Sequence, residues 1–80
     1  MSQWNKLLRK IMEIDRNLRF VEVKKVLEAY GYIASFPNSG SSHCTFRKAG
    51  TSPITIPTHE PIAKVYVLMV KAVVEKEEFK

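Results

Sequence analysis

Apolar side chains recur three and four residues apart near both ends of the chain and alternate with polar ones in its middle. Over residues 2–14 the spacing predicts an amphipathic helix with Ser2 as its N-cap. A second helix is predicted over residues 21–30, because Gly31 stands where a helix C-terminus favours a left-handed residue. A short polar segment connects the two helices.

Three short strands are predicted after the second helix. The segments 32–36, 43–48 and 54–56 are rich in aromatic and β-branched residues, and turn-forming residues separate them. Pro57 ends the third strand, and the short connections favour an antiparallel meander.

The last segment, from about Pro61 to Phe79, contains many β-branched residues, but its length and its apolar spacing predict a helix. The core stripe of this helix is predicted to be Ile62, Val65, Tyr66, Met69 and Val73. The order α-α-β-β-β-α predicts one α+β domain over residues 1–80, with helices packed on one face of a three-stranded antiparallel sheet.

The composition is that of a small globular domain, with 80 residues, 45% hydrophobic and 26% charged. The longest apolar stretch, residues 62–74, contains two lysines and is too short to span a bilayer. The N-terminus lacks the layout of a signal peptide. The single cysteine, Cys44, forms no internal disulfide and no cysteine-based zinc site. We therefore expect a reduced cytoplasmic protein without a membrane span.

The charge is unevenly distributed along the chain. The formal net charge of +5 favours an anionic partner. No Asp or Glu occurs from Ala29 through His59, and this window carries Arg47 and Lys48. Such a window suits phosphate and supplies no carboxylates for divalent cations. An equally good explanation is that short strands and turns simply carry few acids.

Alternation along the second predicted strand gives one face to His43, Thr45 and Arg47. Phe46 is large and apolar and shares the opposite face with Cys44, so that face should meet the helices. We expect the first three side chains to point away from the core, in a row spaced roughly 7 Å apart.

A histidine beside a hydroxyl and a guanidinium on an acid-free face is a candidate phosphate site. Ser41 and Ser42, in the preceding turn, offer hydroxyls and backbone N–H groups to phosphate oxygens, and Lys48 adds a cation. The residues alone leave the alternative open that these are ordinary solvated side chains. From the residues alone, His59, which lies between two prolines, is also expected to be an ordinary loop histidine.

Three segments together resemble the HicA toxin family of small bacterial mRNA-cleaving proteins. They are SGSSHCTFRK (residues 39–48), ITIPTHEPIAKVYVLMVKAVVE (54–75) and, upstream, RFVEVKKVLEAYGY (19–32). The resemblance covers roughly residues 18–74. The helix within residues 1–16 is therefore an extension relative to the shortest members, and its role is open: extra core, a contact with a partner, or neither.

The resemblance implies a double-stranded-RNA-binding-domain-like fold, α-β-β-β-α, behind the additional N-terminal helix. It implies a ribonuclease acting on mRNA without a required metal or other cofactor, whose catalytic residue is the histidine after the glycine-serine turn, here His43. It also implies a cognate HicB-type antitoxin that holds the enzyme inactive.

The chemistry of histidine agrees with this expectation. Metal-free RNA cleavage uses the ribose 2′-hydroxyl as nucleophile, and histidine, with an ordinary pKa of about 6.5, suits the proton transfers. Arg47 and Lys48 are candidates to stabilise phosphate charge, and His59 is a candidate second proton-transfer group.

Two other functions fit the sequence. A non-catalytic RNA-binding module of the same fold would use spread basic residues such as Arg16, Arg19, Lys24 and Lys25. A protein-interaction surface is also expected, because the last helix is apolar around more than half its circumference. An antitoxin, a second copy of the chain or the N-terminal helix would cover that surplus.

Overall fold

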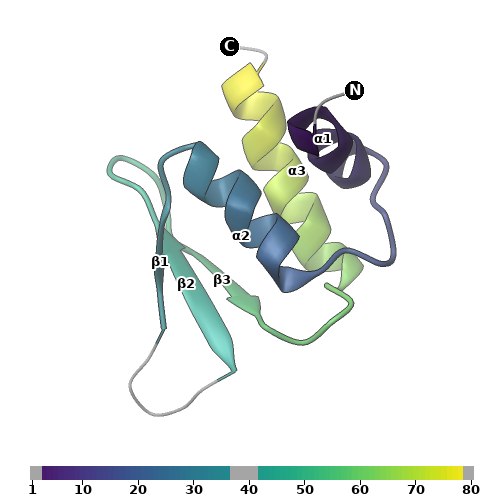
Figure 1. The fold of residues 1–80 in the computed structure, drawn as a ribbon. Helices are drawn as coiled ribbons and strands as arrows, with labels where there is room; N and C mark the ends of the chain where they lie inside the picture. The colour runs from purple at the N-terminus through teal and green to yellow at the C-terminus, as the bar shows by residue number, and fades with distance from the viewer. Residues whose placement is uncertain (1–2, 37–41, 79–80) are drawn as a thin grey trace.

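The computed structural model describes residues 3–36 and 42–78. Its elements are α1 (Gln3–Met12), α2 (Phe20–Ala29), β1 (Ile33–Ser35), β2 (His43–Arg47), β3 (Ile54–Pro57) and α3 (Lys64–Glu78). The strands form an antiparallel sheet in the order β1-β2-β3, and the helices lie on one side of it (Figure 1). The predicted α+β class, element order and sheet are confirmed. Ser2, the predicted N-cap, lies outside the described residues.

Helix α2 ends in a Schellman motif, in which two backbone N–H groups beyond the helix donate to its last carbonyls. The N–H of Gly31 donates to the oxygen of Glu28 at 3.0 Å, and that of Tyr32 to the oxygen of Leu27 at 3.1 Å. Gly31 has a φ of +96°, a conformation that glycine adopts without the steric penalty of a Cβ atom. The predicted helix end at this glycine is confirmed.

The inner face of the sheet packs against the helices. Phe46 and Cys44 are fully buried there, next to Ile54 and Ile56 of β3. The ring of Phe20, at the start of α2, lies 6.1 Å from the ring of Phe46, centroid to centroid. The alternation predicted for the second strand is therefore confirmed, and it leaves the other face of the sheet open.

The core stripe predicted for the last helix is partly wrong. Val65 and Met69 are 58% and 38% exposed, and the helix begins at Lys64 rather than at about Pro61. The buried residues of this segment are Ile62, Val67, Val70, Val73 and Val74. A segment apolar around most of its circumference contains more than one stripe at helical spacing, and packing against the other helices selects among them.

Helix α1 packs against α3 and α2 (Figure 1). Its Ile11 is fully buried in the common core, and Trp4 meets Tyr30 of the α2 terminus edge to face, with ring centroids 5.8 Å apart. The N-terminal helix therefore contributes to the core and covers part of the apolar surface of α3. Within residues 3–36 and 42–78, no helix has the length and apolar character needed to cross a membrane.

Candidate functional site

The residues of the predicted row lie on the open face of the sheet. His43 and Arg47 are exposed, and Thr45 between them is half-buried. The row spans roughly 13 Å from the first residue of β2 to the last, because a strand rises about 3.3 Å per residue. The backbone positions of His43 and Arg47 are therefore further apart than a single phosphate group can bridge.

The remaining residues of this face come from the neighbouring strands, and we call the whole set the outer face. By register it comprises Ile33, Ser35, His43, Thr45, Arg47, Thr55 and Pro57. The hydroxyls of Thr45 and Thr55 lie 3.2 Å apart and share a hydrogen bond. None of the three strands carries an Asp or Glu, so no strand carboxylate repels a phosphate or neutralises Arg47 on this face.

The two histidines lie at the same end of the sheet. His43 pairs with Pro57, and Thr58 continues the pairing one step further: its N–H and its hydroxyl both donate to the carbonyl oxygen of Ser42, at 2.7 and 3.0 Å. Ser42 immediately precedes His43, and Thr58 immediately precedes His59. The fold thus brings the two exposed histidines, 16 positions apart in sequence, to one sheet end.

The loop between β3 and α3 is also fixed to the start of α2. The Oε1 atom of Glu60 accepts the N–H of Phe20 at 2.9 Å, and the N–H of Ile62 donates to the oxygen of Leu18 at 2.9 Å. A carboxylate at a helix N-terminus is favoured by the helix dipole. Glu60, the single acid of this loop, is therefore held by α2, and the segment that carries His59 is tied at both ends.

Lys48 does not join the row. It follows the last residue of β2, at the end of the strand opposite His43, and is half-buried. Its amine pairs with Glu77 near the end of α3 and lies 5.7 Å from the ring centroid of Tyr32. The structure therefore places this lysine in a contact between the sheet and α3, away from the outer face.

Ser42 is exposed directly before His43, whereas Ser41 lies outside the described residues. Cys44 is fully buried on the inner face, and burial raises the pKa of its thiol. This suits a packing residue on the face that was expected to meet the helices, and not a nucleophile. In the part of the chain that the structure describes, no three His, Cys, Asp or Glu side chains are grouped so as to hold a metal ion.

No protein-family model, curated protein or solved structure matches this chain. Sequence reasoning did not identify Thr58 or Glu60, whose hydrogen bonds fix the histidine end of the sheet. The signal available was weak: a hydroxyl residue and an acid on either side of a histidine, directly after a strand.

Proposed function

We propose that this protein is a metal-independent endoribonuclease that cleaves mRNA on its outer face, with His43 as the catalytic residue. The observation that carries the proposal is the exposed His43 at the head of an outward row, on strands without carboxylates and beside a second histidine. The HicA-like motifs at residues 39–48 and 54–75 support the same assignment. On this proposal, the arrangement behind α1 is the double-stranded-RNA-binding-domain-like α-β-β-β-α fold.

The proposed reaction is an internal transesterification. His43 accepts the proton of a ribose 2′-hydroxyl, and the 2′-oxygen forms a bond to the adjacent phosphorus. The bond from phosphorus to the 5′-oxygen breaks, and that oxygen takes a proton from His59 or from water. The products are a 2′,3′-cyclic phosphate and a 5′-hydroxyl, and none of these steps uses a metal ion.

The other predicted residues take positioning roles. Ser42 precedes His43 and is exposed, so its hydroxyl is available to the phosphate being cleaved. Thr45 and Arg47 lie further along the strand, where the 13 Å span lets the guanidinium bind a neighbouring phosphate instead. Lys48 lies away from the outer face, and its ion pair with Glu77 contributes to stability.

We further propose that the enzyme is the toxin of a cytoplasmic toxin–antitoxin pair and is held inactive by a HicB-type antitoxin. The exposed apolar residues of α3, Val65, Leu68 and Met69, support a protein-interaction surface for the antitoxin or for a second copy of the chain. Coexpression of a neighbouring small gene product, followed by copurification, tests this part separately.

The activity itself is tested with purified protein and a single-stranded RNA in excess EDTA. The expected result is chain scission that leaves 2′,3′-cyclic phosphate ends. Binding without scission would contradict the enzyme and favour a non-catalytic RNA-binding module, for which Arg16, Arg19 and Lys25 are exposed.

A further inference from the structure

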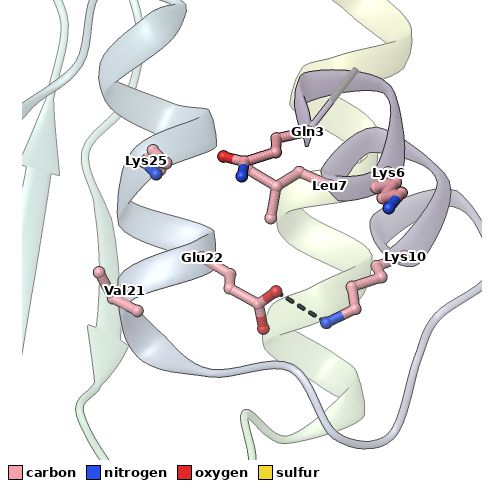
Figure 2. A pocket seen from close by; sticks show the side chains of 7 residues that line it. All are labelled: Gln3, Lys6, Leu7, Lys10, Val21, Glu22 and Lys25. Atoms are coloured by element: carbon pink, nitrogen blue, oxygen red, sulfur yellow. Dashed lines mark hydrogen bonds and ion pairs between the residues drawn. The ribbon is translucent and has the colours of Figure 1, made fainter. Parts of the chain in front are cut away.

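A groove of about 290 Å³ lies between α1 and α2, away from the outer face (Figure 2). Three lysines line it, Lys6 and Lys10 from α1 and Lys25 from α2. Helix α1 contains no Asp or Glu. The groove is therefore positively charged from both walls, and Glu22 is the one carboxylate among the described residues that line it.

Both oxygens of Glu22 are already engaged. Its Oε2 accepts the amine of Lys10 at 2.8 Å, the pair drawn in Figure 2, and its Oε1 accepts the N–H of Arg19 at 3.0 Å. Burial alone would raise the pKa of Glu22, but these hydrogen bonds and the charges of Lys10 and Arg19 outweigh it and hold that pKa below its ordinary value. The carboxylate thus neutralises Lys10 and leaves the other lysines uncompensated.

Lys6 and Lys25 are exposed, and neither forms an ion pair or hydrogen bond with any residue of the described ranges 3–36 and 42–78. They lie on opposite walls of the groove. Between them the groove has apolar surface from Leu7, which points toward α2 in Figure 2, and from Val21, which is 58% exposed. Two uncompensated amines flanking apolar surface suit a ligand with repeated negative charges and flat apolar groups, as in a single RNA strand.

The start of α2 links the groove to the loop at the proposed catalytic end of the sheet. Arg19 is exposed at the start of α2, and the next residue, Phe20, is bound through its N–H to Glu60, the neighbour of His59. Phe20 also packs against Phe36, whose ring is 52% exposed at the end of β1, with ring centroids 6.1 Å apart. The start of α2, next to the groove residues Val21 and Glu22, is therefore hydrogen-bonded to the loop that carries His59.

We propose that the α1–α2 groove binds the phosphate backbone of the RNA strand flanking the cleavage site, chiefly through Lys6 and Lys25. This inference rests on the proposed function, because the strand held in the groove is the strand cleaved at His43. It assigns to the N-terminal helix a binding role in addition to its share of the core. The uncompensated lysines face solvent on both walls, which favours an extended anionic strand over a compact acidic peptide.

The test compares Lys6→Gln/Lys25→Gln with Lys71→Gln/Lys76→Gln, which removes the same charge from α3. Binding of a fluorescein-labelled oligouridine is measured in a His43→Gln background over a range of salt concentrations. The groove variant should bind about tenfold more weakly and lower the slope of log K against log salt by about 1.4, at about 0.7 per lost phosphate contact. The α3 variant should stay near the parent. Oligouridine binding by the groove variant that matches the α3 variant overturns the inference.

Two further outcomes separate this inference from the proposed function. If the groove variant binds oligouridine as tightly as the parent and the wild-type protein cleaves RNA, only the proposal that the groove binds RNA is overturned. If the groove variant binds RNA more weakly but the wild-type protein never cleaves RNA, the ribonuclease proposal is overturned, and RNA binding in the groove is supported. Binding of polyglutamate by the groove in place of oligouridine assigns the groove to an acidic protein partner and overturns the inference.

Discussion

Thr58 donates both its backbone N–H and its hydroxyl to the carbonyl oxygen of Ser42, at 2.7 and 3.0 Å. These two bonds join the loop after β3 to the residue that precedes His43. They fix the spatial relation of the two segments that carry the histidines, so we treat Thr58 as a positioning residue.

Replacing Thr58 by valine keeps the side-chain shape and removes the hydroxyl bond. We expect a loss of about 1 kcal/mol in the free energy of unfolding and a lower kcat for RNA cleavage, with little change in KM. Thr51→Val is the matched control, because the Thr51 hydroxyl makes the same kind of bond, to the carbonyl oxygen of Lys48 at 2.9 Å, at the far end of the sheet. A kcat for Thr58→Val equal to that of Thr51→Val contradicts the positioning role.

Glu22 joins α1 to the first turn of α2, and its contribution to stability should depend on pH. Because the pKa of Glu22 in the folded protein lies below its ordinary value of 4.5, its stabilisation is complete above that value and is lost as the pH falls through the folded-state pKa. Glu22→Gln should lower the free energy of unfolding by about 0.5–1 kcal/mol at neutral pH, and this difference should shrink in acid.

Chemical denaturation at several pH values measures the Glu22 effect. Glu28→Gln is the control, because it removes a more exposed ion pair, to Lys24 at 3.3 Å within α2, and should lose less stability at neutral pH. A difference between wild type and Glu22→Gln that stays constant from neutral pH into acid would show that the charge of Glu22 is not the cause.

Cys44 should react very slowly with thiol reagents in the folded protein. It is fully buried, and burial raises the pKa of its thiol, so little thiolate forms and reagents do not reach it. Labelling with a chromogenic disulfide reagent should be slow in buffer and fast in denaturant. RNA cleavage should survive prolonged exposure to the reagent. Rapid labelling under native conditions would show that the inner face of the sheet is not packed as described.

The outer face was predictable from the sequence because a strand alternates with a period of two, and a single large apolar residue, Phe46, decides which face is buried. The buried stripe of α3 was not predictable from the sequence. Val65 and Val67 are equally apolar, and only the packing of α1 and α2 decides which of them is buried. Glu77, the partner of Lys48, lies 29 positions away in sequence. No local pattern shows that pairing, so the sequence alone makes Lys48 a candidate phosphate-binding cation.

The central claim is that His43 transfers the proton in RNA cleavage. The most direct measurement is the single-turnover cleavage rate of one RNA in EDTA by wild type, His43→Gln and His59→Gln, with binding and thermal unfolding recorded for each. Glutamine keeps polar contacts but transfers no proton at neutral pH. We expect His43→Gln to lose at least about 100-fold in rate, as for removal of a general base, while RNA binding and thermal unfolding stay near wild type. His59→Gln should lose less. A His43→Gln protein that cleaves within a few fold of the wild-type rate would contradict the assignment of His43 as the catalytic residue.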